Sequence, residues 1–389
     1  MRRMDDWTGR GDMGERPRLA SRRQALVGSA RLVGGALLLS VGTASVTPDG
    51  GQSVAFAQAM PTGGVDPQMQ EVLDALAALD PLPLETVIPR QARELPSVAD
   101  AVQGALAARG QPPAVETVGQ IEHRLIPGGP SSEGTLVRIY TPASGTGPFP
   151  VLVYFHGGGW VIANLNVYDA SARALTNAAN AVVVSVAYRQ APENPFPAAV
   201  DDAYAAYQWV VGNAATFNGD PAHVAVGGES AGGNLAAVTA LLAHQRGFAP
   251  PVHQLLVYPV TDFVGDYPSY QENFDAKPLS TPALQWFGRY YLRSDADRQD
   301  PRASPLRAPD LHGLPSATVI LAEIDPLRDQ GAAYATRLRE AGVPVTVRLY
   351  QGVTHEFFGT GAVVDQAKDA VAVAAAGLRA AFSARPSVK

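Results

Sequence analysis

Hydrophobic positions along the chain follow two different patterns. The stretches IEHRLIP, from Ile121, and LVRIYTP, from Leu136, alternate apolar and polar residues, as half-buried antiparallel strands do. Six later runs are apolar almost throughout: VLVYF at 151, AVVVSVAY at 181, HVAVGG at 223, HQLLVYP at 253, ATVILAE at 317 and VTVRLY at 345. Strands that are apolar on both faces are typical of a parallel sheet covered on both sides.

Helical stretches separate most of these runs, at about 198–211, 234–244, 332–341 and 365–382. Strands that alternate with helices indicate an α/β fold. The sequence therefore predicts an eight-stranded, mostly parallel sheet with helices on both faces, in which two antiparallel strands lead into six parallel ones.

The region before the first strand has a helical pattern. Met69, Val72 and Leu76 recur near a period of 3.6 residues, and Pro81 stops that helix. A second helix is expected over Val98 to Ala108. Such a pair alone would expose an apolar face, so residues 60–118 are expected to pack on the sheet.

The first 59 residues resemble a twin-arginine export signal. Arg22 and Arg23 precede a moderately apolar run whose core, Leu32 to Val46, is shorter than the roughly 20 residues that span a bilayer. AFAQA then gives an A-x-A cleavage pattern at Ala57 to Ala59, with cleavage after Ala44 as the alternative. We therefore expect a periplasmic or secreted protein.

Composition narrows the classes of protein. The 389 residues include no cysteine, which excludes disulfides, thiolate zinc sites and iron–sulfur clusters. The formal net charge is −6, without a basic block, so nucleic acid is not an expected partner. We expect no cofactor, no metal and no stable membrane anchor, and either a monomer or a homodimer.

One serine lies among small residues in GGESAGGN, residues 227–234. Gly228 to Gly232 fits G-x-S-x-G, a sharp turn from a strand into a helix that exposes a serine hydroxyl. Glycine relieves crowding at such a turn, and the start of the helix favours negative charge. Ser230 is therefore the candidate nucleophile.

A serine nucleophile needs a base, and the base needs an orienting acid. In proteins with this kind of turn, the serine comes first along the chain, the acid second and the histidine third. Of seven histidines, only His355 lies between the last strand and the last helix. Asp325, at the end of the seventh strand, is the favoured acid, and Asp262, after the sixth strand, is the alternative.

A glycine-rich loop, FHGGGW at residues 155–160, follows the strand VLVYF. Consecutive glycines allow backbone N–H groups to point at one spot, where they would stabilise the oxyanion of a tetrahedral intermediate. The N–H of Ala231, which follows the nucleophile, would complete this oxyanion hole.

Five motifs together resemble the bacterial hormone-sensitive-lipase family of alpha/beta-hydrolase esterases. They are HGGGW, YRQAPENPFPAAVDDA, GGESAGGNLAA, DPLRDQG and VTHEFF, which occur in the family's order over roughly 120–383. The resemblance implies that Ser230, Asp325 and His355 are the nucleophile, acid and base. The oxyanion donors would be the N–H groups of Gly158, Gly159 and Ala231.

The resemblance also implies a helical cap over a catalytic domain at 119–389. The cap would consist of residues 60–118 and an insert at about 263–293. Aromatic residues are expected to line an acyl pocket there, with Trp160, Trp286 and Phe358 as candidates. Two residues depart from the family pattern: Glu229 stands where aspartate is commoner, and Glu356 where many members carry glycine.

These features predict a serine carboxylesterase that works through an acyl-enzyme, and the resemblance implies short-to-medium acyl esters as substrates. A formamidase-like amidase is an alternative, since a related motif combines His-Gly-Gly with Trp. A non-catalytic ligand receptor on the same fold is a second alternative, but such proteins typically lose the base, and His355 is present.

Overall fold

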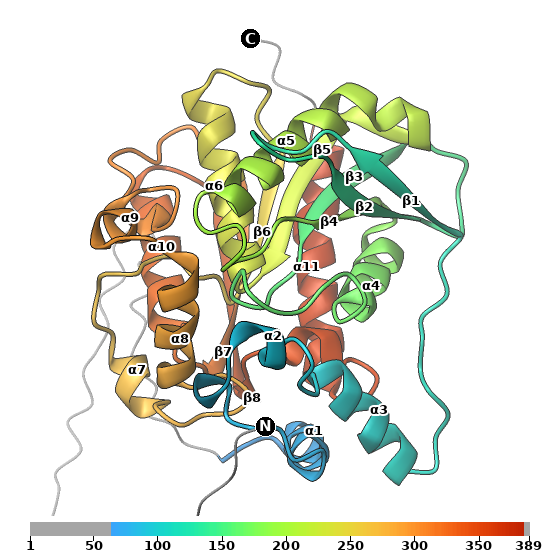
Figure 1. Cartoon of the computed structure of the whole chain (residues 1–389). Helices are drawn as coiled ribbons and strands as arrows, with labels where there is room; N and C mark the ends of the chain where they lie inside the picture. Colours follow the sequence, from blue (N-terminus) through green and yellow to red (C-terminus); the bar gives the residue numbers. More distant parts are fainter. Residues whose placement is uncertain (1–63, 385–389) are drawn as a thin grey trace, which may run out of the picture. The chain divides into compact units, whose positions relative to one another are not determined.

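Eight strands form one sheet in the order β1-β2-β4-β3-β5-β6-β7-β8, in a computed structural model that describes residues 64–384 (Figure 1). The strands are β1 (Gln120–Ile126), β2 (Thr135–Thr141), β3 (Phe149–Phe155), β4 (Val182–Ala187), β5 (Gly219–Glu229), β6 (His253–Val257), β7 (Ser316–Ile324) and β8 (Val345–Thr354). β2 pairs antiparallel with β1 and β4, and the other neighbours are parallel. The predicted fold class is confirmed.

The strand β3 shows why the central strands are apolar throughout. Val151, Val153 and Phe155 pack in the core on one face of the sheet, while Leu152 and Tyr154 pack in the core on the other. All five side chains are fully buried. Successive side chains of a strand point to opposite faces of the sheet. In a strand that is covered on both sides, every side chain is therefore buried, and apolar residues are favoured at every position.

Helices cover both faces of the sheet (Figure 1). One face is covered by α4 (Asp169–Ala179) and α11 (Asp365–Ser383), and the other by α5 (Ala198–Asn213), α6 (Ala231–Gln245) and α10 (Arg328–Glu340). Short 3₁₀ turns occur at η2 (Ala214–Phe217) and η4 (Phe357–Thr360). In residues 64–384, no helix is both long and apolar enough to cross a membrane.

Two further segments lie beside the carboxyl ends of the parallel strands (Figure 1). The N-terminal segment contains α1 (Pro67–Ala78), η1 (Leu84–Thr86), α2 (Pro89–Ala92) and α3 (Val98–Ala108). The insert between β6 and β7 contains α7 (Pro268–Glu272), α8 (Thr281–Tyr291), α9 (Asp295–Gln299) and η3 (Pro305–Arg307). The helix expected over Val98 to Ala108 is present with those bounds. The predicted export signal, residues 1–59, lies outside the described residues.

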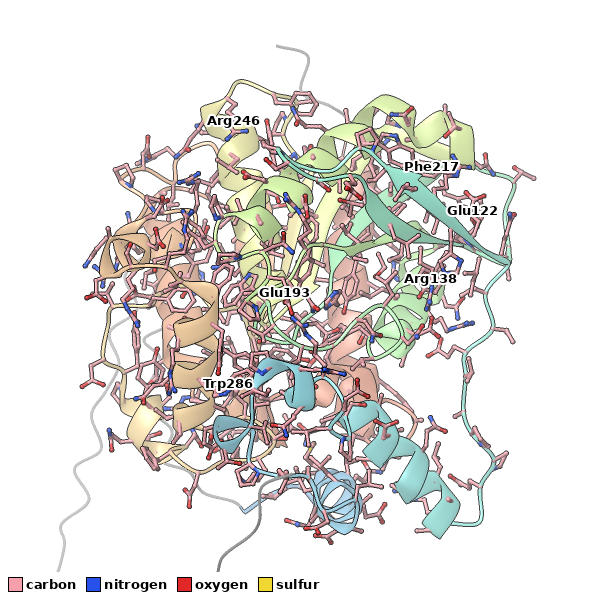
Figure 2. The ribbon with its side chains drawn as sticks, viewed as in Figure 1. Glu122, Arg138, Glu193, Phe217, Arg246 and Trp286 are labelled. Carbon is pink, nitrogen blue, oxygen red and sulfur yellow. The ribbon has the colours of Figure 1, made fainter. Side chains whose placement is uncertain are left out.

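The N-terminal segment has two separate roles in packing. Met69 and Val72 of α1 are buried in the same core as α11. Just before α1, the Asp66 N–H donates to the Gly352 carbonyl of β8 at 2.8 Å. Around α2 the segment instead contacts the insert, where the Trp286 Nε1–H donates to the Val87 carbonyl at 2.9 Å. Figure 2 labels Trp286, which lies on α8 of the insert. Residues between Leu76 and Val98 of this segment line the cavity at the candidate active site.

Candidate active site

The candidate nucleophile lies on a strained turn between β5 and α6. Ser230 has φ 57° and ψ −117°, values that a residue with a side chain rarely adopts. Its N–H donates to the Val257 carbonyl at 2.9 Å, and its own carbonyl accepts from the Asn234 N–H at 3.0 Å. These backbone bonds hold the strained conformation and keep the Ser230 hydroxyl at the carboxyl end of the sheet.

The glycines around Ser230 are required by the close approach of β3. A Cβ atom on Gly228 would lie 2.5 Å from the Phe155 carbonyl oxygen, and one on Gly232 would overlap that same oxygen. Both distances are well below van der Waals contact. Side chains at these positions would push the turn away from β3 and displace the hydroxyl.

The structure brings the three predicted triad side chains together. Ser230, Asp325 and His355 follow β5, β7 and β8, whose carboxyl ends meet at one edge of the sheet. His355 Nε2 lies 3.0 Å from Ser230 Oγ, and His355 Nδ1 lies 2.8 Å from Asp325 Oδ2. The Leu327 N–H donates to Asp325 Oδ1 at 2.8 Å, which fixes the carboxylate. This continuous chain of hydrogen bonds can transfer the serine proton to the imidazole.

The surroundings of His355 favour its protonated form. The ring is buried, which by itself would lower the pKa of His355, whereas the charge and the hydrogen bond of the adjacent Asp325 carboxylate raise it. The negative charges of Glu356 and Glu229 raise the pKa of His355 further. Together these carboxylates outweigh the effect of burial, so the pKa of His355 lies above its ordinary value of 6.5. The site thus stabilises the imidazolium that forms when the base takes a proton.

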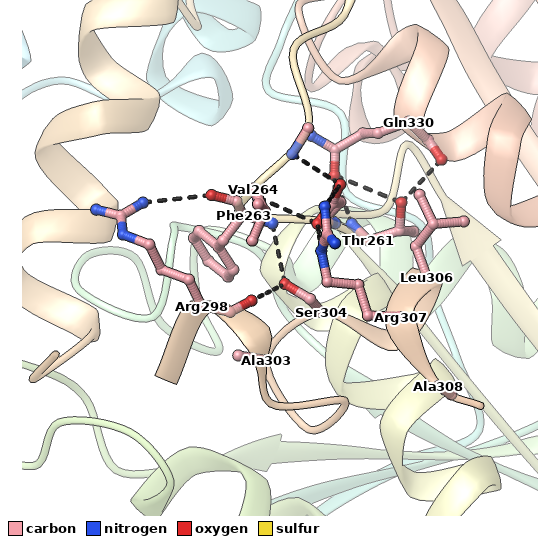
Figure 3. Close-up of polar contacts among 12 residues, drawn as sticks. Thr261, Phe263, Val264, Arg298, Ala303, Ser304, Leu306, Arg307, Ala308 and Gln330 are labelled. Atoms are coloured by element: carbon pink, nitrogen blue, oxygen red, sulfur yellow. Dashed lines mark hydrogen bonds and ion pairs between the residues drawn. The ribbon is translucent and has the colours of Figure 1, made fainter. Parts of the chain in front are cut away.

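The carboxylate of the alternative acid, Asp262, bonds side chains outside the triad. Its carboxylate accepts from Arg307 Nε at 2.7 Å and from the Tyr267 hydroxyl at 2.8 Å. Figure 3 shows the neighbouring bonds, in which Gln330 accepts from the Thr261 backbone. Burial would raise the pKa of Asp262, but these partners lower it below its usual range. Because it is Asp325 that bonds His355, the geometry favours Asp325 as the acid.

The glycine loop after β3 presents free N–H groups to the candidate nucleophile. Gly158 and Gly159 have φ values of 99° and 55°, which glycine adopts without strain. Neither of their N–H groups, nor that of Ala231, donates to another group in the described part of the chain. Gly158 and Gly159 line the same cavity as Ser230. The predicted oxyanion donors are therefore available to a bound carbonyl oxygen.

A cavity of about 470 Å³ opens on this site. Apolar side chains from the N-terminal segment and the insert form much of its wall, among them Leu82, Leu84, Leu95, Leu279 and Phe287. Trp160 also lines the cavity and stacks on Tyr291, with the ring centroids 4.1 Å apart.

The prediction is wrong for two other aromatic residues. Trp286 and Phe358 are both buried but are not among the described residues that line the cavity. The indole of Trp286 faces away to bond the Val87 carbonyl, and Phe358 packs in the core shared with α4 and α11. Each holds elements together and does not contact the cavity.

Sequence reasoning missed the hydrogen bonds of two carboxylates that lie next to the triad. Glu229 accepts hydrogen bonds from the hydroxyls of Tyr154 and Tyr258, and Glu356 accepts one from Tyr168 at 2.7 Å. Glu229 and Glu356 stand out in the sequence as departures from the family pattern, but no partners and no role were predicted for them. Nothing in the sequence pattern identifies the three tyrosines as their partners. In residues 64–384, no group of three or more His, Cys, Asp or Glu side chains could hold a metal ion.

Comparisons with known proteins identify the fold and the class of enzyme. A sequence profile described as alpha/beta hydrolase fold matches residues 152–359. Carboxylesterase NlhH of Mycobacterium tuberculosis is 44 % identical over 252 residues, 64 % of this chain and 79 % of NlhH. Ethyl acetate hydrolase of Pseudomonas putida is 40 % identical over 60 % of this chain and 74 % of its own length. The solved esterase of Pyrobaculum calidifontis has a TM-score of 0.74 at 37 % identity and covers 82 % of this chain and 99 % of its own.

The fold, the serine turn and these relatives together define an alpha/beta hydrolase. The chain belongs to the hormone-sensitive-lipase-like esterases of the alpha/beta hydrolase fold family, as the sequence motifs predicted. It is a carboxylic ester hydrolase.

Proposed function

We propose that this enzyme hydrolyses esters of short-to-medium acyl chains by two-step acyl transfer through Ser230. The observation that carries the proposal is the unbroken hydrogen-bond chain from Asp325 through His355 to Ser230, open to an apolar cavity of about 470 Å³. The name of a relative, ethyl acetate hydrolase, supports a small ester as substrate.

In the first step, Ser230 Oγ attacks the ester carbonyl carbon while His355 Nε2 takes the hydroxyl proton. The carbonyl oxygen becomes an oxyanion that accepts hydrogen bonds from the N–H groups of Gly158, Gly159 and Ala231. Asp325 keeps the proton of the neutral imidazole on Nδ1 and stabilises the imidazolium. The C–O bond then breaks, and the alcohol leaves with the proton from Nε2.

In the second step, water repeats the sequence on the acyl-enzyme. His355 takes a proton from the water molecule, whose oxygen attacks the acyl carbon and forms a second oxyanion in the same hole. Collapse of this intermediate releases the carboxylic acid and returns the proton to Ser230 Oγ. The two steps together consume one ester and one water molecule, release one alcohol and one carboxylic acid, and return Ser230 and His355 to their starting protonation states.

The acyl-length preference is tested with p-nitrophenyl esters and purified residues 60–389. Hydrolysis of the acetate, butyrate and hexanoate esters is expected to exceed hydrolysis of the palmitate ester, because the cavity of about 470 Å³ must hold both the acyl chain and the alcohol part of the ester, and short acyl chains leave room for both. A preference for palmitate would overturn the proposal. A matched pair of butyryl ester and butyryl anilide separates an esterase from an amidase.

We further propose that residues 1–59 direct twin-arginine export and that the mature enzyme acts in the periplasm or outside the cell. The paired Arg22 and Arg23, the weakly apolar run that follows and the A-x-A pattern support this proposal.

A further inference from the structure

A buried carboxylate that the acyl-transfer steps do not use lies directly before the candidate nucleophile. Glu229 is only 1 % exposed. Its Oε1 accepts from the Tyr154 hydroxyl at 2.5 Å, and its Oε2 accepts from the Tyr258 hydroxyl. Burial raises the pKa of Glu229. Removing a carboxylate from water costs several kcal/mol, and such groups concentrate at functional sites.

One of these two phenols also packs against the candidate base. The rings of Tyr258 and His355 lie 4.4 Å apart between centroids, at an interplanar angle of 50°. Tyr258 directly follows β6 and has φ 35°, an unfavourable value for a bulky residue. Its N–H donates to the Ile320 carbonyl at 2.7 Å, which helps to hold that conformation. Backbone strain of this kind persists where the surrounding structure enforces it, often at active sites.

The hydrogen bond that Asp325 accepts from His355 fixes only one edge of the imidazole. The bond to Nδ1 sets the position of that nitrogen, at 2.8 Å, but a single bond does not prevent the ring from tilting about it. A tilt would move Nε2 away from Ser230 Oγ, which lies 3.0 Å away. A ring packed against the imidazole resists such a tilt if it is itself anchored.

We propose that Glu229 and Tyr258 are positioning residues for His355. The hydrogen bond from the Tyr258 hydroxyl to Glu229 anchors the phenol ring, and the ring holds the imidazole where it reaches Asp325 and Ser230 together. Neither residue lines the cavity that opens on Ser230. The inference rests on the proposed roles of Ser230 and His355 but not on which ester the enzyme prefers.

The chain offers a matched pair of variants for the test. Tyr258→Phe keeps the ring and removes its hydrogen bond to Glu229. Tyr154→Phe removes the other hydrogen bond to the same carboxylate, from a ring that lies on β3 and does not stack on His355. Tyr258→Phe is expected to lower kcat for p-nitrophenyl butyrate about tenfold with KM unchanged, because small misplacements of catalytic groups are costly. Tyr154→Phe is expected to stay within about twofold of wild type.

Glu229→Ala removes the anchor itself. Because the two residues act in series, the double variant Glu229→Ala with Tyr258→Phe should be no slower than the slower single variant. Thermal unfolding confirms that each variant is folded. If Glu229→Ala does not fold, the comparison of the two tyrosine variants decides the question alone.

A second readout separates this inference from the proposed function. The rate of inactivation by a fluorophosphonate reports the activation of Ser230 without any ester turnover, and it should fall in Tyr258→Phe and not in Tyr154→Phe. If the wild type fails to hydrolyse p-nitrophenyl butyrate, the proposed function fails, and the inactivation rates still test the positioning roles. Equal losses in the two tyrosine variants, no loss in Tyr258→Phe, or a change confined to KM would overturn the inference.

Discussion

At the scale of single residues, the active site depends on backbone conformations that most residues avoid. Ser230, Tyr258 and Glu356 all have positive φ values, and each lies next to the triad or within it. Such residues cost of order 1–3 kcal/mol each, so the surrounding hydrogen bonds must hold them in place. The arrangement of the site is thus built into the fold before a substrate arrives, which is the condition for efficient electrostatic stabilisation.

The triad roles predict a characteristic set of kinetic losses. Ser230→Ala and His355→Ala should each lower kcat by about 10⁶, and the double variant should be little worse, because the residues act as a unit. Asp325→Asn should cost about 10⁴, because the amide favours the wrong imidazole tautomer. Steady-state kinetics on p-nitrophenyl butyrate measures all three.

Asp262→Asn is the matched control for Asp325→Asn. It weakens the bonds from Arg307 and Tyr267, so the free energy of unfolding is expected to fall by about 2 kcal/mol while kcat stays close to wild type. If Asp262→Asn cripples turnover and Asp325→Asn is mild, the assignment of the acid is wrong.

The raised pKa of His355 sets the direction of the pH dependence. Only the neutral imidazole can accept the Ser230 proton, and the imidazole becomes protonated as the pH falls through its pKa. Because the pKa of His355 lies above its ordinary value of 6.5, kcat/KM should begin to fall at a pH above the range of a free histidine. A profile of kcat/KM between pH 5 and pH 9 measures this limb, and a midpoint below 6.5 would contradict it.

At the scale of elements, Trp286 joins α8 to the N-terminal segment. Trp286→Phe removes the hydrogen bond and leaves the Val87 carbonyl without its donor. Trp160→Phe is the matched control, since the Trp160 Nε1–H has no partner among the described residues. Both variants lose similar volume, so Trp286→Phe should lower the free energy of unfolding by about 1 kcal/mol more. Urea unfolding measures the difference, and equal values would show that the bond does not stabilise the cap.

The central strands could be predicted from the sequence, because strands buried on both faces are apolar at every position, as VLVYF at 151–155 is. Triad positions were readable because each residue directly follows a strand. The direction of an aromatic side chain could not be predicted from the sequence. Trp160 and Trp286 are both large and apolar, so either could line an apolar pocket. Tertiary packing decides that the Trp160 indole lines the cavity and that the Trp286 indole bonds a backbone carbonyl.

At the scale of the whole chain, parallel topology assembles the site from distant segments. Ser230 and His355 are 125 residues apart, yet they meet because parallel strands end at the same edge of the sheet. The same topology made the order of serine, acid and histidine along the chain informative. The partners of Glu229 could not be inferred in this way, because Tyr154 and Tyr258 reach it from the ends of two other strands.

The proposed export of the whole chain depends on Arg22 and Arg23 as a pair. The twin-arginine machinery recognises both residues, whereas the general secretory route requires only positive charge. Replacing both arginines with lysines keeps the charge, so the precursor is expected to remain in the cytoplasm. Fractionation of cells expressing the full chain, with sequencing of the exported N-terminus, measures both outcomes. Normal export of the double lysine variant would exclude the twin-arginine route, and a mature N-terminus at Ser45 in place of Met60 would correct only the cleavage site.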